Sequence, residues 1–155
     1  MEPVLQTILN LRKKHQLTSE ITVTGDSMEP FLKETDIVSI QPCKQYCPGD
    51  ILVYSYKEEL LIHRLLFVKN GKWYCKGDNA FRLEDVFPPE IFGKVTAARR
   101  GDSLVSFHPK NMERFLELSA KVNTAFRKCG YDKEKTKNTA IYQTYCEERN
   151  NVKEK

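Results

Sequence analysis

The middle of the sequence, residues 18–108, is built of short segments that have the composition of β-strands. They are rich in β-branched and aromatic residues, and no long helical pattern separates them. Turn sequences such as "CPGD" (47–50) and "KNGK" (69–72) lie between neighbouring segments. The seven segments are 20–24, 36–42, 50–56, 60–69, 72–77, 93–100 and 103–107. This pattern predicts a mainly β fold, either a coiled antiparallel or mixed β-sheet or a barrel.

A short amphipathic helix is expected ahead of this region, over about residues 3–15. Val4, Ile8 and Leu11 recur there at helical spacing. We expect this helix to pack on the β region. Its apolar face is short and has no Trp or Phe, so binding to a membrane surface is the less favoured alternative.

The last third of the chain has a helical pattern. Phe115, Leu118, Val122 and Phe126 form one apolar stripe, and a second, more polar helix is expected from about 134 to 149. The sequence thus divides into an N-terminal helix (1–17), a β domain (18–108) and a basic helical extension (109–155). Two roles remain open for the extension: covering an open edge of the sheet, or recruiting a partner in maturation or export.

Composition excludes several classes of function. The net charge is +4, and the surplus lies in residues 109–155, with 11 basic and 7 acidic residues, too weak a bias to indicate a nucleic-acid partner. No apolar run has the roughly 18–20 residues of a membrane span, and the N-terminus lacks the order of a secretory signal. The five cysteines form no CxxC pair. We therefore expect a cytoplasmic protein with free thiols, no transmembrane anchor, no metal and no cofactor.

The stretch "VTGDSMEP" (23–30) contains the candidate nucleophile, Ser27. Taken alone it is typical of a turn that leads into a short helix. A serine becomes a nucleophile only when a base removes its proton. Among three histidines, His63 is distinctive because it lies in the apolar strand "LLIHRLL". A titratable ring in such a strand is either a hydrogen-bonded core histidine or a functional one.

A base of this kind needs an acid to orient it. The segment "KGDNAFRLEDV" (76–86) offers Asp78, in a turn after a strand, and Asp85. From the residues alone, Asp78 is equally explained as a cap of local backbone N–H groups, and Asp85 as a surface acid.

The order of these motifs resembles the type I signal peptidase family. "GDSMEP", "PGDILVYS", "LLIHRLL" and "KGDN" follow one another over about residues 21–100. That family shares a superfamily with the LexA-like self-cleaving repressors. The bacterial branch has a lysine as general base, whereas the archaeal and endoplasmic-reticulum branch has a histidine followed by arginine. His63-Arg64 is similar to the second branch.

The resemblance implies a role for each candidate residue. Ser27 would be the nucleophile and His63 the general base. Asp78 and Asp85 match acids of that branch; we favour Asp85 as the orienting acid and Asp78 as its support. Because the downstream spacing differs from the branch pattern, Glu84 is an alternative.

The resemblance also implies an oxyanion hole that uses the Ser27 backbone N–H. Some family members add a hydroxyl two positions before the nucleophile, where this chain has Gly25. Thr24 or another backbone N–H is then expected to replace it. Met28 would pack beneath the site.

The substrate implied by the resemblance is a peptide or protein precursor that binds as an added β-strand. It would lie between residues 21–24 and 60–63 and carry small residues near the cleaved bond. The expected binding residues are Ile21, Val23, Thr24, Met28, Leu61 and Ile62. Signal peptidases have a transmembrane anchor and this sequence has none, so we expect a soluble peptidase that removes a leader from a precursor. The alternatives are a non-catalytic peptide-binding module on the same fold and, less favoured, a self-cleaving LexA-like regulator.

Overall fold

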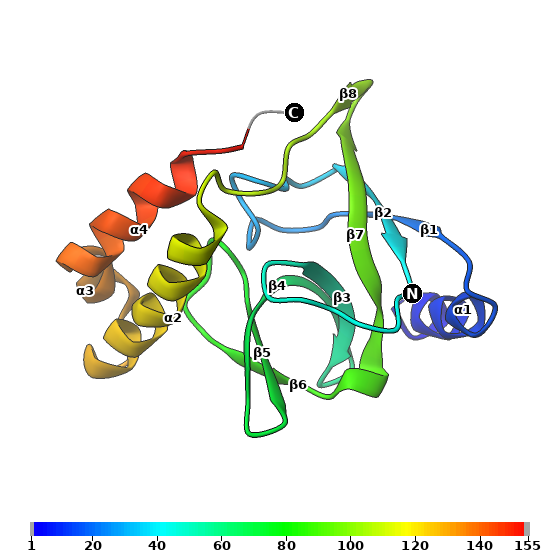
Figure 1. Cartoon of the computed structure of the whole chain (residues 1–155), viewed down its shortest axis with the longest axis horizontal. Helices are drawn as coiled ribbons and strands as arrows, with labels where there is room; N and C mark the ends of the chain where they lie inside the picture. Colours follow the sequence, from blue (N-terminus) through cyan, green and yellow to red (C-terminus); the bar gives the residue numbers. More distant parts are fainter. Residues whose placement is uncertain (1, 154–155) are drawn as a thin grey trace.

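The computed structural model describes residues 2–153, and its centre is an eight-stranded sheet in which the strands pair antiparallel (Figure 1). The order is β1-β2-β7-β3-β4-β5-β6, and β8 pairs with β7. The strands are β1 (Ser19–Thr22), β2 (Ile37–Gln41), β3 (Ile51–Tyr56), β4 (Glu59–Lys69), β5 (Lys72–Lys76), β6 (Glu84–Val86), β7 (Ile91–Arg100) and β8 (Ser103–Leu104). The predicted mainly β fold is confirmed, as a curved sheet that does not close.

Strand β3 shows why the sequence folds this way. Residues 51–54 are all fully buried, because the two faces of the strand pack into different apolar clusters. Ile51 and Val53 belong to the main core, whereas Leu52 and Tyr54 belong to a smaller cluster on the other face. A strand buried on both faces reads as an unbroken apolar run rather than an alternation. The main core consists of Leu9, Ile21, Val23, Met28, Leu32, Val38, Ile40, Ile51, Val53, Phe92, Val95 and Ala98.

The β4–β5 hairpin follows the expected turn chemistry. Asn70 and Gly71 both have positive φ, +53° and +76°. Two successive positive values match the right-handed twist of a hairpin, and Asn-Gly tolerates them best. Strand β4 is paired with β5 only from Arg64 onward, so its first half, 59–63, has β3 on one edge and no described strand on the other.

Several details differ from the sequence prediction. Strand β6 was not predicted, because three residues are too short to show alternation. Strand β8 covers only 103–104 of the expected 103–107. The second C-terminal helix is two helices: Asn138 ends the first, and the hydroxyl of Thr139 caps the next by accepting from the Tyr142 N–H at 3.3 Å.

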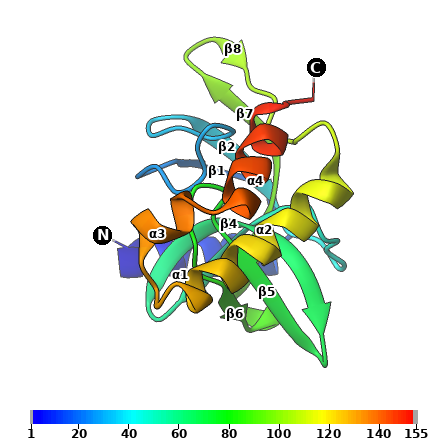
Figure 2. The same cartoon turned by 90° about the vertical axis from the view of Figure 1, so that its left-hand side faces the viewer.

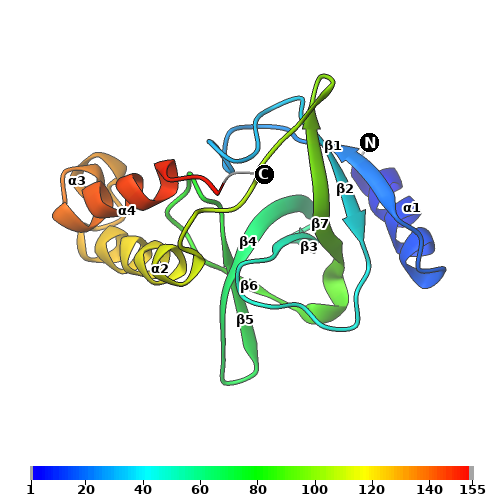
Figure 3. The same ribbon diagram turned by 45° about the horizontal axis from the view of Figure 1, so that its top comes forward.

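Helix α1 (Glu2–Lys14) packs on the sheet on the side opposite the C-terminal helices (Figures 1 and 3). Leu9 is buried in the main core, whereas Val4, Ile8 and Leu11 are 63%, 49% and 59% exposed. The predicted apolar stripe is therefore only partly used against the sheet. Within residues 2–153, no helix combines the length and apolar content that crossing a membrane requires.

The C-terminal helices are α2 (Met112–Lys128), α3 (Lys133–Lys137) and α4 (Ala140–Asn150), and α2 and α4 lie side by side (Figure 2). The predicted stripe of α2 is buried in a second core. This core also takes in Phe31 and Phe81, which belong to loops of the β region. Phe31 packs edge-on against Phe115 with ring centroids 5.8 Å apart. The helices therefore pack against the loops that surround Ser27.

Candidate active site

Ser27 lies in a loop that follows β1. Gly25 has φ +77°, a left-handed conformation that suits glycine, and the Glu29 N–H closes a turn onto the Asp26 carbonyl at 3.1 Å. Ser27 is half-buried, whereas its neighbour Met28 is 2% exposed and anchors the loop in the main core. Met28 thus fixes the loop, while Ser27 stays partly exposed.

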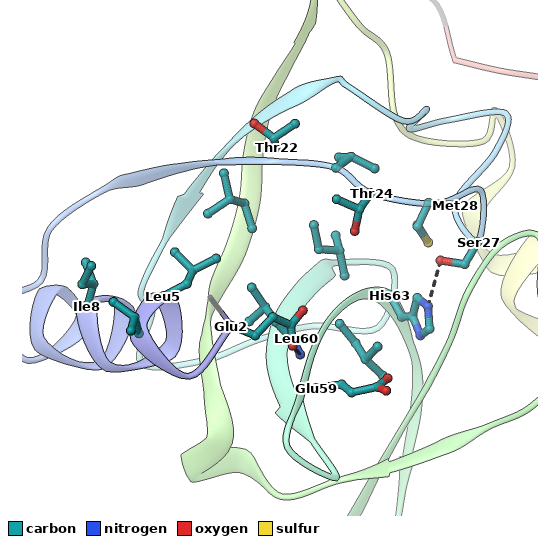
Figure 4. Close-up of a pocket in the computed structure, with 15 residues that line it drawn as sticks. Glu2, Leu5, Ile8, Thr22, Thr24, Ser27, Met28, Glu59, Leu60 and His63 are labelled. Carbon is teal, nitrogen blue, oxygen red and sulfur yellow. Dashed lines mark hydrogen bonds between the residues drawn. The ribbon is translucent and has the colours of Figure 1, made fainter.

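His63 lies opposite Ser27 on the first half of β4. Its Nε2 is 3.0 Å from Ser27 Oγ (Figure 4). The ring is 7% exposed, and its other nitrogen, Nδ1, is 2.6 Å from Glu84 Oε1. The imidazole is therefore held between a hydroxyl and a carboxylate, the geometry in which a histidine takes a proton from a serine.

Glu84 is held by a further residue that the sequence analysis did not identify. The Tyr54 hydroxyl donates to Glu84 Oε1 at 2.7 Å and lies 3.4 Å from His63 Nδ1. Burial raises the pKa of Tyr54 well above its usual value, so the hydroxyl stays protonated and remains a donor. Strand register explains why Tyr54 lies near His63. Leu52 pairs with His63, so the two side chains lie on the same face of the sheet, and Tyr54, two residues along β3, shares this face with Leu52.

Asp85, the favoured acid from the sequence, lies elsewhere. Strand β6 alternates, so Glu84 is buried and Asp85 is exposed. The Asp85 carboxylate faces Lys72 Nζ at 3.7 Å, with about half of each side chain exposed. Of the acids considered, the structure brings Glu84, the alternative, to His63.

Asp78 is bound to the residue that follows His63. Its carboxylate accepts three hydrogen bonds from Arg64, the shortest 2.7 Å, and both side chains are fully buried. Arg64 also donates to the carbonyls of Gly49 and Phe107, at 2.9 and 2.8 Å, and to His108 Nδ1 at 3.0 Å. A buried ion pair is tolerated when further hydrogen bonds satisfy its donors, as here. Asp78 therefore ties its loop to β4 rather than to the imidazole.

Gly77 shows how closely this loop crosses the site. A Cβ at this position would lie 2.7 Å from the Ser27 carbonyl oxygen and 3.1 Å from His63 Nε2. No side chain fits there without displacing one of them. Two residues on, the Asn79 N–H donates to the Ser27 carbonyl at 2.8 Å.

A cavity of about 710 Å³ extends from Ser27 and His63 to helix α1 (Figure 4). All six residues expected to bind substrate line it, together with Thr22, Leu60 and part of α1. The lining is Glu2, Val4, Leu5, Ile8, Ile21, Thr22, Val23, Thr24, Ser27, Met28, Glu59, Leu60, Leu61, Ile62 and His63.

Both walls of this cavity present backbone groups. Val23 exchanges backbone hydrogen bonds with Asp36 and Thr35, at 2.8 and 2.9 Å, so by alternation the backbone groups of Thr22 and Thr24 face the cavity. On the other wall, the Leu60 N–H turns away from β3 and donates to Glu2 Oε2 at 3.0 Å.

Ile62 follows Leu60 by one strand period, so its N–H and C=O also turn away from β3. The two walls are therefore unpaired strand edges, of the kind that an extended peptide joins by hydrogen bonding. Among residues 2–153, no three His, Cys, Asp or Glu side chains converge as metal ligands do.

A comparison with models of protein families gives a match over much of the chain. A family model described as Peptidase S24-like matches residues 3–96, a range that includes Ser27, Tyr54, His63 and Glu84 and ends before the C-terminal helices. No curated protein matches the sequence.

Proposed function

The chain belongs to the peptidase S24-like family, and we propose that it is a serine endopeptidase in which Ser27 is the nucleophile, His63 the general base and Glu84 the acid that orients the base. The observation that carries this proposal is the unbroken series of contacts from Ser27 Oγ to His63 Nε2, 3.0 Å, and from His63 Nδ1 to Glu84 Oε1, 2.6 Å.

Acylation begins when Ser27 Oγ attacks the carbonyl carbon of the scissile peptide bond. His63 Nε2 accepts the hydroxyl proton, and Glu84 stabilises the imidazolium that forms. The tetrahedral intermediate collapses when His63 gives this proton to the leaving amine. The amino-side part of the substrate remains attached to Ser27 as an ester.

Deacylation repeats these proton transfers with water. His63 takes a proton from a water molecule, whose oxygen attacks the ester carbon, and then returns the proton to Ser27 Oγ. The product leaves with a new carboxylate. The carbonyl oxygen of each tetrahedral intermediate is stabilised by the Ser27 backbone N–H.

The two unpaired strand edges support an extended substrate. A peptide strand in the cavity meets backbone groups of Thr22 and Thr24 on one side and of Ile62 on the other. Main-chain hydrogen bonds fix its register, and alternate side chains point toward the cavity walls. The ester must be held in place for deacylation, so we assign this cavity to the amino side of the scissile bond.

The biological substrate that we propose is a peptide or protein precursor from which a leader is removed in the cytoplasm. The resemblance to signal peptidases supports this class, including the small residues expected near the cleaved bond. The activity needs only the chain's own residues and a water molecule.

Mass spectrometry tests the proposal. The native chain and Ser27→Ala are incubated with a library of extended peptides that carry small residues, and each chain is also weighed after incubation alone. Cleavage of peptides by the native chain only is the expected result. Loss of mass from the native chain itself, with no peptide cleaved, would instead indicate the self-cleaving activity that the family also includes.

One feature favours a second candidate, a module that binds peptides without cleaving them. Gly25 stands where some relatives supply an oxyanion-stabilising hydroxyl, and loss of such a donor costs about 10²–10³ in rate in other enzymes. The same peptides decide between the two: binding to both chains with no cleavage by the native one identifies the binding module.

A further inference from the structure

Helix α4 contacts the loop that crosses the candidate active site, although it lies outside the range matched by the family model. The Tyr145 hydroxyl donates to the Asp78 carbonyl at 2.7 Å, and Arg149 Nη1 donates to Asn79 Oδ1 at 3.1 Å. Both bonds join α4 to residues 77–80.

Asn79 in turn bonds the loop that contains Ser27. Its backbone N–H donates to the Ser27 carbonyl at 2.8 Å, and its side-chain Nδ2 donates to the Asp26 carbonyl at 3.2 Å. Because Arg149 holds the opposite end of the same amide, the orientation of Asn79 is fixed from both sides. Two successive hydrogen bonds therefore link α4 to the backbone of the loop that contains Ser27.

Within residues 2–153, Arg149 forms no ion pair with a carboxylate, and its Nε is buried without a hydrogen-bond partner. Its other contacts include the Cys146 sulfur, at 3.6 Å, and the face of the Tyr145 ring, with the guanidinium carbon 5.7 Å from the centroid. A half-buried cation costs solvation energy, and its bond to Asn79 is the contact that it makes with the site.

The same loop is also held from beneath. Lys76 is fully buried and donates to the carbonyls of Gly77 and Ala80, at 2.9 and 2.8 Å. Its Nζ lies 4.9 Å from the centroid of the Tyr145 ring. Tyr145 thus contacts both the loop and the lysine that bridges the ends of the loop, so displacing α4 affects the whole segment.

We propose that Tyr145 and Arg149 are positioning residues for Ser27, acting through the loop 77–80. The inference rests on the proposed peptidase function for its kinetic consequence. Small displacements of a reacting atom cost large factors in rate, about 10²-fold for 1 Å. The C-terminal helices then set the turnover of an active site to which they contribute no reacting group.

The test compares Arg149→Ala with Arg114→Ala. Arg114 also belongs to the helical unit, where its exposed bond to Glu148 at 2.8 Å joins α2 to α4 without contacting the loop. The first measurement is exchange of the Asn79 amide proton followed by NMR. We expect exchange to be about tenfold faster in Arg149→Ala and unchanged in Arg114→Ala, because only the first removes a hydrogen bond that holds the side chain of Asn79, the residue whose backbone N–H bonds Ser27.

The second measurement is the kinetics of peptide cleavage. We expect Arg149→Ala to lower kcat about tenfold with KM within twofold, and Arg149→Lys to recover part of the loss, since lysine keeps a donor for Asn79. The double variant Asn79→Ala/Arg149→Ala should be no slower than Asn79→Ala, because both substitutions break one relay.

The exchange rates and the cleavage kinetics each test the inference. Unchanged exchange in Arg149→Ala overturns the inference whatever the activity. Faster exchange with unchanged kcat, or with additive effects in the double variant, also overturns it, because the contact is then only structural. A native chain that cleaves no peptide overturns the proposed function, and the exchange rates then still decide whether α4 holds the Ser27 loop.

Discussion

Glu84 Oε1 lies 2.6 Å from His63 Nδ1, while the adjacent acid, Asp85, lies on the opposite face of strand β6. Pairing between β5 and β6 sets this arrangement, since Cys75 pairs with Glu84 and Tyr74 with Asp85. Cys75 is fully buried, so its partner also faces inward. A shift of one residue in this short pairing would exchange the two acids.

Substituting each acid separately tests this assignment. Glu84→Gln should lower kcat by about 10²–10⁴-fold, because the imidazolium loses its counter-charge and the tautomer of His63 is no longer fixed. Asp85→Asn, the matched control, should cleave like the native chain. Steady-state cleavage of one peptide by all three proteins is the measurement. Loss of activity in Asp85→Asn with Glu84→Gln unaffected would reverse the assignment.

The sequence predicted most of the strands and singled out Ser27 and His63, which the structure brings together, for reasons that the structure makes clear. The β region is dense in β-branched residues and turn signals, and His63 is a titratable residue in an apolar strand. The sequence alone does not settle the choice between Glu84 and Asp85, because only strand register distinguishes two adjacent acids. Register is set by which face is buried, and a three-residue strand shows no alternation from which to read it.

Long-range contacts explain what else the sequence did not reveal. Tyr54 meets Glu84 across 30 residues of chain and Tyr145 meets Asp78 across 67, and neither spacing is a local pattern. The role of Asp78 depends on its partner: an aspartate in a turn is typical of a backbone cap, but here Arg64 is delivered to it by β4.

Tyr54 should contribute to catalysis by holding Glu84. Tyr54→Phe removes the hydroxyl that donates to Glu84 Oε1 while keeping the ring packed in the core, so we expect kcat to fall about tenfold, the effect of losing a hydrogen bond of about 1.5 kcal/mol to a charged group. Tyr56→Phe is the control, since Tyr56 lies two residues along the same strand. Peptide cleavage should be compared at a pH where both variants are folded. Equal rates for Tyr54→Phe and the native chain would remove Tyr54 from the site.

Asp78 should matter for stability more than for proton transfer. Asp78→Asn leaves Arg64 with an uncompensated buried charge, a change that costs about 3–5 kcal/mol of unfolding free energy in other proteins. We therefore expect a large drop in the urea midpoint of Asp78→Asn. The exposed pair between Lys72 and Asp85 supplies the control, because breaking it with Asp85→Asn should change the midpoint little. A native-like midpoint for Asp78→Asn would contradict the role of the buried pair.

Stability should also fall in mild acid because of His108. Burial, and then the charge of Arg64, lowers its pKa to about 4. The unfolded chain binds a proton on this residue below about pH 6.5, whereas the folded chain does not until about pH 4. Between these two pH values the unfolded state holds more protons than the folded state. The free energy of unfolding therefore has its full value above pH 6.5 and decreases as the pH falls toward 4.

The variant His108→Asn isolates this effect, because its amide oxygen can still accept from Arg64 while the side chain does not titrate. We expect the urea midpoint of His108→Asn to change less between pH 6.5 and 4 than that of the native chain. Other groups titrate in both proteins, so the difference between the two curves is the relevant quantity. Parallel curves would show that His108 is not protonated differently on unfolding.

Helix α1 should select substrates at the far end of the cavity. Ile8 is half-exposed and lines the cavity, and the strand from His63 to Leu60 spans about 10 Å at roughly 3.3 Å per residue. At roughly 3.3 Å per residue, a substrate residue about three to four positions before the scissile bond therefore reaches the part of the cavity that α1 lines. Ile8→Asp should raise KM about tenfold for a peptide with an apolar residue there, without changing kcat, because it removes apolar contact from binding alone.

Leu11→Asp is the matched control, since Leu11 is exposed on the same helix but does not line the cavity. A peptide truncated before these positions should be cleaved equally by all three proteins, and a raised KM for the truncated peptide would place the effect of Ile8 elsewhere.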